Sequence, residues 1–345
     1  MKILVTGGAG FVGSHVAERY AKEGHDVTIF DNLSRGELLK KPIKHLDYNK
    51  SFLSKFKNVK FVNGDIRKAE DIATAAKDAD VIFHTAAQTA VTTSLTDPRP
   101  DYEVNILGTF NVLEAARKSG RNPSIIYCST NKVFGNNVNK IRVVEKPDHY
   151  EFEPSYKKGV PADFSIDLCE HTPYGVSKLT GDLYAQDYAH VYGLKTGVFR
   201  MSCIYGTRQL GVEDQGWVAW FTIATILGKP LTIYGDGKQA RDVLFVTDLV
   251  ELYDRFLKSS LKHGVFNTGG GPKNTLSLLQ LLDLLEKITG KRSKIGYGDW
   301  RASDQKVFIA DISAAKEALG WEPKVSPQEG VKKLAEFVSE NKNLF

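Results

Sequence analysis

Tyr174 and Lys178 are the two residues whose types and spacing best suit proton transfer. They lie four residues apart at the start of a predicted helix, so they share one face of it. A phenol normally ionises at a pH of about 10, and a neighbouring ammonium favours the phenolate and lowers that pKa. The spacing alone fits two readings equally well: a general base with its lysine, or a packing tyrosine beside a solvated lysine.

Two hydroxyl residues stand at the end of a predicted strand before this pair. Ser129 and Thr130 close the run Ser-Ile-Ile-Tyr-Cys-Ser-Thr. Ligands of open parallel sheets bind at the carboxyl ends of the strands. We therefore expect Thr130 to hydrogen-bond the substrate hydroxyl that Tyr174 deprotonates, which favours the catalytic reading of the tyrosine and the lysine.

Glycines near the N-terminus have the spacing of a dinucleotide-binding turn. Gly7, Gly10 and Gly13 stand between the first predicted strand and the first predicted helix. The first permits a tight turn, the second lets a pyrophosphate approach the backbone, and the third lets helix and strand pack closely. The free N–H groups and the dipole at the helix start favour the diphosphate charge.

Asp31 indicates which dinucleotide is bound. It closes the second predicted strand, close to the roughly 20-residue spacing at which an acid binds the adenosine ribose. A carboxylate there hydrogen-bonds a free 2′-hydroxyl and repels a 2′-phosphate, so NAD is favoured over NADP. Asp65, after the third strand, is a candidate for holding the adenine amine, and a plain turn acid is the alternative.

Strands and helices alternate through the first 200 residues. The expected strands are 2–6, 26–31, 59–63, 81–85, 124–129 and 195–200. The expected helices are 11–23, 69–77, 98–119 and 173–192. Near-continuous apolar strands separated by helices predict a parallel sheet covered on both faces, the doubly wound α/β (Rossmann) fold.

Two polar segments interrupt this alternation, and we interpret 36–57 and 136–171 as surface excursions, the second near the active site. Beyond residue 205 the pattern loosens into short strands (231–234, 243–246, 265–267) and helices that end with 327–341. We predict an NAD-binding domain over 1–200, with later segments near 240–265 returning to it. A smaller substrate-binding lobe is expected over most of 201–345.

Composition narrows the class of protein. Apolar residues make up 42% and charged residues 25% of the 345, as in globular enzymes, and the net charge is only +5. We interpret the basic cluster Lys40, Lys41 and Lys44 as a solvated loop, so nucleic acid is not an expected partner. Isolated Cys128, Cys169 and Cys203 indicate neither disulfides nor a metal site. With no signal-peptide layout and no apolar run near the roughly 20 residues of a membrane span, we expect a cytoplasmic protein.

Together, the glycine turn, the strand-end hydroxyl and the Tyr-x-x-x-Lys motif resemble the extended short-chain dehydrogenase/reductase family, whose members modify nucleotide sugars. Further similar segments are Phe83–Ala87, Asn105–Thr109, Gly235–Asp242 and Arg301–Asp304. The resemblance covers almost the whole chain. It implies that Thr130, Tyr174 and Lys178 are the catalytic trio, and that Asn105 supports the lysine.

The resemblance also implies which residues contact the ligands. NAD would be held by Gly7, Gly10, Phe11, Val12, Gly13, Asp31, Asn32, Asp65, Ile66, Ala86, Ala87, Asn105, Ser129, Tyr174 and Lys178. The nucleotide sugar would be held by Gln88, Thr93, Thr130, Asn131, Arg200, Gln215, Trp217, Arg241 and Arg301. For Arg241 and Arg301, which would pair with a diphosphate, surface ion pairs are the alternative; Trp217 equally suits a core position. Cys203 departs from the pattern, because many relatives have an asparagine there.

Within this family, the segments Gln88–Ser94, Ser129–Gly135 and Asp214–Val218 are similar to the CDP-paratose 2-epimerases. The implied activity is inversion of carbon 2 of a CDP-linked hexose by transient oxidation with bound NAD, in a homodimer. The alternatives are a UDP-sugar 4-epimerase and, from another class, a non-catalytic NAD-binding sensor or scaffold. A 4,6-dehydratase is disfavoured, because Asn131 and Lys132 stand where that enzyme needs an acid pair.

Overall fold

The computed structural model describes residues 1–40, 44–213, 215–301 and 303–345, so Lys41, Asp214 and Ala302 of the segments above lie outside the described residues. Two compact units make up the chain. The first consists of Met1–Val133, Thr172–Arg200 and Val250–Phe266, and the second of Phe134–His171, Met201–Leu249 and Asn267–Phe345. This division differs from the expected boundary at residue 200 chiefly because Phe134–His171 belongs to the second unit.

A seven-stranded parallel sheet forms the centre of the first unit, in the order β12-β8-β5-β4-β1-β2-β3. Its strands are β1 (Lys2–Thr6), β2 (Asp26–Asp31), β3 (Val59–Asn63), β4 (Val81–His84), β5 (Ser124–Thr130), β8 (Thr196–Met201) and β12 (His263–Thr268). The chain order reverses on either side of β1, which pairs with both β2 and β4. The predicted doubly wound α/β fold is thus confirmed, with the reversal beside the glycine-rich turn.

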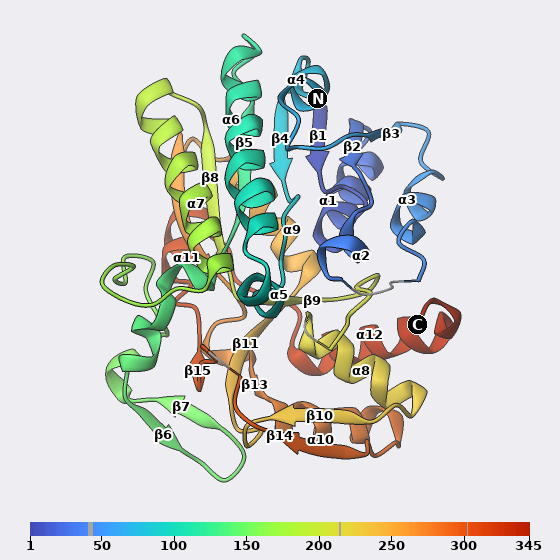
Figure 1. Cartoon of the computed structure of the whole chain (residues 1–345), viewed down its shortest axis with the longest axis vertical. Helices are drawn as coiled ribbons and strands as arrows, with labels where there is room; N and C mark the ends of the chain where they lie inside the picture. The colour runs from blue at the N-terminus through green and yellow to red at the C-terminus, as the bar shows by residue number, and fades with distance from the viewer. Residues whose placement is uncertain (41–43, 214, 302) are drawn as a thin grey trace. The chain divides into compact units, whose positions relative to one another are not determined.

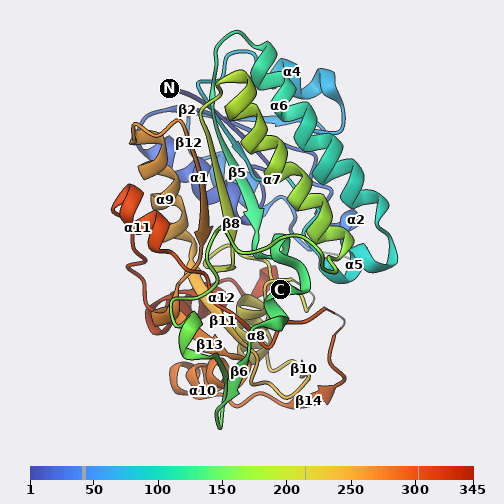
Figure 2. The same cartoon turned by 90° about the vertical axis from the view of Figure 1, so that its left-hand side faces the viewer.

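Helices cover both faces of this sheet (Figures 1 and 2). They are α1 (Phe11–Lys22), α2 (Arg35–Leu38), α3 (Tyr48–Leu53), α4 (Ala69–Ala76), α5 (Val91–Thr96), the π-helix η1 (Asp101–Gly108), α6 (Thr109–Lys118), α7 (Pro173–Tyr192) and α9 (Val246–Lys258). On one face, α4, α6 and α7 pack through a cluster that includes Ile72, Val112 and Tyr188. On the other, aromatic rings of Tyr20 on α1 and Tyr253 on α9 contact Phe83.

Two first-unit segments differ from the sequence prediction. The segment 36–57 contains α3, whose Leu53 is fully buried and whose Asn49 donates to the carbonyl of Gly10 at 3.3 Å, so part of it packs on the glycine-rich turn instead of forming a surface excursion. The single helix expected over 98–119 is a π-helix, η1, that runs into α6. Its wider turns bury Asp101 and Asn105 together.

The second unit has its own core and its own small sheets. Its elements are η2 (Asn131–Lys140), β6 (Val143–Glu145), β7 (Tyr150–Phe152), η3 (Pro154–Tyr156), β9 (Cys203–Tyr205), α8 (Trp217–Leu227), β10 (Leu231–Tyr234), β11 (Ala240–Phe245), η4 (Pro272–Asn274), β13 (Thr275–Ser277), α10 (Leu278–Thr289), β14 (Ile295–Gly298), β15 (Val307–Phe308), α11 (Ser313–Leu319), α12 (Pro327–Glu340) and η5 (Lys342–Leu344). β11 pairs with β9, β13 and β15, and β10 with β14. The apolar faces of α8, α10 and α12 pack on these strands. In the part of the chain that the structure describes, no helix combines the length and apolarity needed to cross a bilayer.

Candidate active site

The helix α7 positions the predicted acid–base pair, and its N-terminus is well defined. Thr172 caps it by accepting a hydrogen bond from Gly175 N at 3.2 Å, and Pro173 occupies its first turn. Tyr174 therefore lies in the first turn, where its side chain forms a hydrogen bond with Thr130 at the end of β5. The predicted hydroxyl residue and the predicted base are thus brought together.

The pKa of Tyr174 corrects one sequence expectation. We expected the lysine to lower it, but burial raises the pKa of Tyr174 to about 12, and the hydrogen bond from Thr130 only partly opposes this rise. The negative charge of Asp101 on η1 raises it further. Burial disfavours the phenolate, so the neutral phenol is the stable form in this environment.

Lys178 lies one turn along α7 and is 3% exposed. Burial lowers its pKa to about 8, while Cys128 and Asp182 favour its charged form. Its ammonium lies 4.3 Å from the centroid of the Tyr127 ring. A lysine of this kind changes charge close to neutral pH, as an acid–base group in a reaction site must.

Asn105 joins α7 to the loop after β4. Its amide donates to Ser177 Oγ at 2.9 Å and to the carbonyl of Gln88 at 3.0 Å, and its Oδ1 accepts from the Gln88 N–H at 2.9 Å. Ser177 directly precedes Lys178 in the chain. Asn105 therefore holds the turn of α7 that carries the lysine, in keeping with the supporting role that the family resemblance implies.

The structure does not place Gln88 as a pocket residue. The side chain is 0% exposed, donates to Asp101 Oδ2 at 2.8 Å and accepts a hydrogen bond from the Ala90 N–H. Its amide is thus used within the unit, which speaks against direct contact with a sugar. Asp101 is buried too, and its pKa is raised to about 6 by burial.

Arg200 is likewise committed to a partner inside the first unit. Its guanidinium donates to Asp182 at 2.9 and 3.0 Å, and both side chains are buried. Ser129 adds a 2.6 Å hydrogen bond to the same carboxylate. Arg200 thus anchors α7 to β8, and its predicted contact with substrate is not supported; Ser129 is an anchor of the same kind.

The glycine-rich turn has the form that a diphosphate requires. Gly7 has a φ of 69°, and a Cβ on it would lie 2.6 Å from Ala86 N; a Cβ on Gly13 would lie 2.4 Å from the Gly7 carbonyl. Gly10 is the N-cap of α1, and no acidic residue stands in the first turn, which begins with Phe11 and Val12. Backbone N–H groups and the helix dipole are thus available to an anion, so these residues fit NAD.

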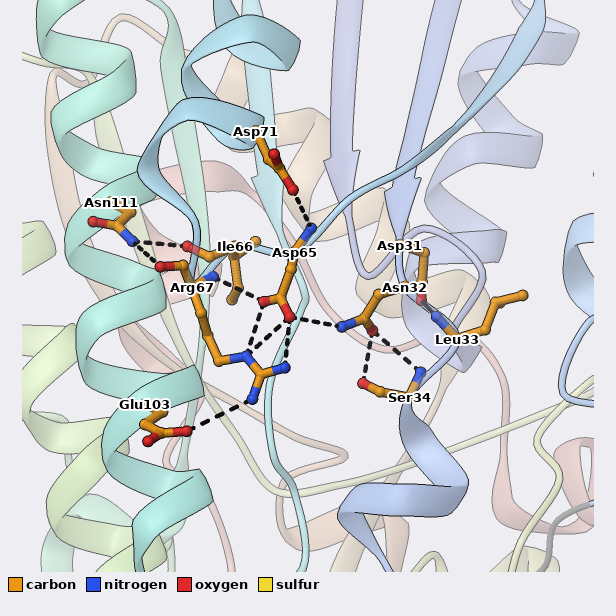
Figure 3. Close-up of polar contacts among 10 residues, drawn as sticks. All are labelled: Asp31, Asn32, Leu33, Ser34, Asp65, Ile66, Arg67, Asp71, Glu103 and Asn111. Carbon is orange, nitrogen blue, oxygen red and sulfur yellow. Dashed lines mark hydrogen bonds and ion pairs between the residues drawn. The ribbon is translucent and has the colours of Figure 1, made fainter.

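The acids predicted to bind the adenosine half lie beside this turn (Figure 3). Asp31 accepts from Ala9 N at 3.0 Å and Leu33 N at 2.8 Å, which fixes its carboxylate against the glycine-rich loop. Burial raises its pKa. Asn32 donates to Asp65 at 3.1 Å, so the turns that follow β2 and β3 are joined.

Asp65 has a partner that sequence reasoning missed. Arg67 donates to both of its carboxylate oxygens, at 2.6 to 3.0 Å, and these hydrogen bonds lower the pKa of Asp65 (Figure 3). Asn111 donates to the carbonyls of Ile66 and Arg67 at 2.9 and 3.1 Å and so fixes this turn. An arginine two residues after the acid was the available signal.

Four first-unit candidates remain, three of which follow closely on the carboxyl ends of strands β4 and β5. Ala86 and Ala87 follow β4 and are partly exposed, and Thr93 lies on α5, also partly exposed. Asn131 directly follows β5, and its Oδ1 accepts from Thr130 Oγ1 at 3.3 Å. These positions suit contact with a ligand.

Within the second unit, a pocket of about 340 Å³ contains one of the two predicted diphosphate arginines. Arg301 lines it together with Trp300, Asp304 and Lys306, and the Arg301 guanidinium lies 4.1 Å from the Tyr234 ring centroid. Arg241 reaches the pocket wall indirectly, by donating to Asp304 Oδ1 at 2.8 Å. Both arginines are thus associated with one cavity.

Trp217 and Gln215 lie apart from the residues that line this pocket. The Trp217 indole donates to Cys203 Sγ at 3.3 Å and packs on the core of the second unit, as its alternative reading held. Gln215 is partly exposed, and its N–H donates to the Val212 carbonyl at 2.9 Å. The unusual cysteine is therefore the hydrogen-bond acceptor of the tryptophan.

Comparison with known proteins agrees with this geometry. The sequence profile of the NAD dependent epimerase/dehydratase family matches residues 3–269. The chain is similar to CDP-paratose 2-epimerase of Salmonella typhi, with 42% identity over 98% of this chain and 99% of that protein. It is similar in structure to UDP-glucose 4-epimerase of Thermotoga maritima, crystallised with UDP-glucose (TM-score 0.80, 32% identity, 99% and 100% covered). UDP-glucuronic acid 4-epimerase of Bacillus cereus, in complex with UDP-glucuronic acid and NAD, matches equally (TM-score 0.80, 29% identity, 100% of both chains).

The chain belongs to the NAD dependent epimerase/dehydratase family. It is an enzyme, and its cofactor is NAD. The predicted resemblance to the CDP-paratose 2-epimerases is confirmed by the 42% identity, and the alternative of a non-catalytic sensor or scaffold is set aside.

Proposed function

We propose that this enzyme is a nucleotide-sugar epimerase that inverts carbon 2 of a CDP-linked hexose. The observation that carries this proposal is the similarity to CDP-paratose 2-epimerase, at 42% identity along essentially the whole of both chains. The similar UDP-sugar 4-epimerases of known structure are 29–32% identical. The first-unit geometry supports the reaction, because Thr130, Tyr174 and Lys178 lie at the carboxyl end of β5 and the start of α7.

In the proposed mechanism, Tyr174 takes the proton of the carbon-2 hydroxyl of the sugar. Thr130, whose side chain forms a hydrogen bond with Tyr174, orients the same sugar hydroxyl. NAD supplies hydride acceptance from carbon 2 and hydride return to it. Lys178, with a pKa of about 8, stabilises the phenolate that proton transfer requires. Tyr174 then returns the proton to the oxygen of the inverted carbon, so no cofactor is consumed.

Residues that would hold the ligands follow from the same geometry. The turn of Gly7, Gly10 and Gly13 would cradle the NAD diphosphate, and Asp31 would accept from the adenosine ribose. Arg301 and Arg241 would hold the substrate diphosphate, since a planar fork of donors matches a phosphate. The substrate-binding role of the second unit is part of this proposal.

Product analysis tests the proposal directly. Purified enzyme is incubated with CDP-paratose, CDP-tyvelose, CDP-glucose, UDP-glucose and UDP-glucuronic acid in deuterated water, and products are assigned by NMR. We expect interconversion of CDP-paratose and CDP-tyvelose without deuterium at carbon 2. Inversion of carbon 4 of a UDP-sugar instead would establish the second candidate, a UDP-sugar 4-epimerase, which the structural relatives favour. Deuterium at the inverted carbon would exclude direct hydride return.

The catalytic assignment has its own test. Tyr174→Phe removes only the hydroxyl, so we expect kcat to fall by about a hundred- to ten-thousandfold while NAD stays bound, because general acid–base catalysis contributes about 10² to 10⁴. Thr180→Val, an exposed change on the same helix, is the matched control. Retained turnover in Tyr174→Phe would contradict the assignment of the base.

We also propose a homodimer, formed through the exposed face of η1, α6 and α7. Apolar side chains gather there: Tyr102, Leu107, Phe110, Val176, Leu183, Tyr184, Val191 and Tyr192 are each at least 38% exposed. An exposed apolar set on neighbouring helices marks an interaction site. Light scattering of the purified protein checks this, with Leu183→Glu expected to give monomers. A cytoplasmic location is a further proposal, and three free cysteines suit a reducing compartment.

A further inference from the structure

The environment of the Lys178 ammonium contains an aromatic face. Lys178 Nζ lies 4.3 Å from the centroid of the Tyr127 ring, and Tyr127 is 0% exposed. A cation over the face of an aromatic ring is attracted by the ring quadrupole, and the attraction is strongest where both groups are out of water. Tyr127 lies on β5, three residues before Thr130, so it belongs to the strand that supplies the hydroxyl residue.

The ring is held in this position from two directions. Its hydroxyl donates to the carbonyl of Lys178 itself at 3.1 Å, so one tyrosine contacts both the backbone and the ammonium of the lysine. Gly181 makes this approach possible, because a Cβ there would lie 2.2 Å from the Tyr127 hydroxyl. The same hydroxyl interacts with Thr109 on α6.

A buried polar chain continues beyond Thr109 and keeps this region rigid. Thr109 Oγ1 lies 2.9 Å from His84 Nε2, and His84 Nδ1 lies 2.8 Å from Thr6 Oγ1. Burial and the nearby lysine lower the pKa of His84 to about 3, so the imidazole is neutral at physiological pH. The chain therefore connects β1, β4, α6 and α7 without adding a second cation beside Lys178.

We propose that Tyr127 is a positioning residue for the reaction, whose ring face holds the ammonium of Lys178 and whose hydroxyl fixes the helical turn that carries it. This role rests on the proposed function, in which Lys178 acts with Tyr174. The physical reason is that a buried ammonium is costly unless a partner stabilises its charge. An aromatic face does so without accepting a hydrogen bond, so the N–H groups of the ammonium stay free to donate to other atoms. Tyr127 thus keeps the lysine charged and its three donors available.

The charges that face Lys178 set the expected effect on its titration. Asp182 on α7 and Cys128 on β5 favour the ammonium, and neutral His84 on β4 adds no charge. Asp101 on η1 acts on Tyr174. Loss of the ring would remove a contact worth about one pKa unit, so the pKa of Lys178 should fall from about 8 towards 7, whereas loss of the hydroxyl alone should change it little.

Two substitutions at the same position separate these contributions. Tyr127→Phe keeps the ring and removes the hydroxyl, and Tyr127→Leu removes both. The enzyme with its NAD is labelled with ¹³C at lysine Cε, and the Lys178 signal is assigned by its loss in Lys178→Met. We expect this signal upfield of the other lysines in the wild type and in Tyr127→Phe, because it lies over a ring, and back among the others in Tyr127→Leu.

Kinetics supply the second readout. We expect Tyr127→Leu to lower kcat about tenfold and to move the alkaline limb of the kcat profile about one pH unit lower, while Tyr127→Phe keeps the wild-type profile. A purely structural role would lower activity in both variants without moving that limb. An ordinary Lys178 signal in the wild type, or an unmoved alkaline limb in Tyr127→Leu, would overturn the proposal, and the wild-type measurement decides even if Tyr127→Leu does not fold. If Tyr174→Phe and Lys178→Met stay active although the wild type shows the upfield signal, the proposed function fails and the ring contact stands.

Discussion

The carboxyl end of β5 with α7, and the pocket around Arg301, are built on opposite principles. In the first region, polar side chains are buried and satisfied by one another, as with Asp182 between Arg200 and Ser129. In the second, Arg301, Asp304 and Lys306 line a cavity and lie on the irregular chain around the two-residue strand β15. One region fixes a geometry, and the other presents charged side chains to a cavity.

This difference teaches where rigidity is needed for an epimerase. Groups that transfer a proton must be held within fractions of an ångström, which a satisfied buried network achieves. A diphosphate handle needs strong charge but tolerates adjustment, which arginines on loops provide. Substitutions should therefore affect stability in the first region and substrate affinity in the second.

The largest expected effect is on the buried pair of the first region. Asp182→Ala leaves the Arg200 guanidinium buried without its carboxylate, which costs about 3–5 kcal/mol in the free energy of unfolding. Urea unfolding measures it. The double variant Asp182→Leu with Arg200→Met is the control and should recover most of the loss. A cost under about 1 kcal/mol in Asp182→Ala would break the comparison.

A slightly smaller effect is expected on the pH dependence of the free energy of unfolding. It tests whether buried carboxyls behave alike in the first and the second unit. Burial raises the pKa of Asp101 to about 6 in the first unit and that of Asp242 to about 6 in the second, from an ordinary 3.8. A raised pKa means that the folded state binds protons more tightly than the unfolded chain, so the stability each carboxyl contributes is present below pH 3.8 and is lost as pH rises to about 6. We expect the free energy of unfolding to fall over that window by at most about 3 kcal/mol for Asp242, and by less for Asp101, which is the less deeply buried of the two.

Substitution of each carboxyl by asparagine assigns this loss of stability to the first unit or to the second. Asp101→Asn retains an oxygen for the Gln88 amide and should remove one share of the pH dependence, and Asp242→Asn the other share. Asp242 accepts from the Ser202 hydroxyl and from the Gly271 N–H, and an amide would lose strength in both bonds, so Asp101→Asn should be the more stabilising substitution at pH 7. An unchanged pH slope in both variants would contradict the assignment.

The smallest effect on stability is expected at the pocket. Arg301→Met should change the free energy of unfolding by less than about 1 kcal/mol, yet raise KM about ten- to a hundredfold with little change in kcat, because a charged hydrogen bond contributes about 1.5–3 kcal/mol. Steady-state kinetics with the nucleotide sugar measure this. Arg292→Met, an exposed arginine of the same unit, is the matched control. A fall in kcat alone would place Arg301 at the reacting carbon instead.

The first unit was predictable because its signals are local. Strands β1, β2 and β3 and helix α7 have the predicted bounds, since apolar runs, Pro173 and the glycine turns are read directly from the sequence. The prediction that Thr130, Tyr174 and Lys178 act together rests on equally local signals, a strand end and a four-residue helical spacing. The sequence did not reveal that Arg200 and Gln88 are buried against Asp182 and Asp101, because a family position carries no information on such contacts.

The second unit shows which strands could not be predicted from the sequence. Short strands such as β13 and β15 pair with β11 from distant parts of the chain, and two or three residues carry too little periodicity to predict a strand. In the first unit, the position of Tyr127 under Lys178 likewise depends on a contact between two elements, β5 and α7. The two-residue spacing of Asp65 and Arg67 and the four-residue spacing of Lys178 and Asp182 were the signals that the sequence did offer.

The π-helix η1 makes the alignment of this centre depend on residue count. Asn105 meets Ser177 and the backbone of Gln88 from within that widened helix, just before α6 begins. Each residue of an ordinary α-helix turns the chain by about 100°, so removing a single residue from η1 would rotate Asn105 away from both partners while leaving α6 in place. In this chain, the contacts that hold the helical turn of Lys178 thus depend on the number of residues in η1.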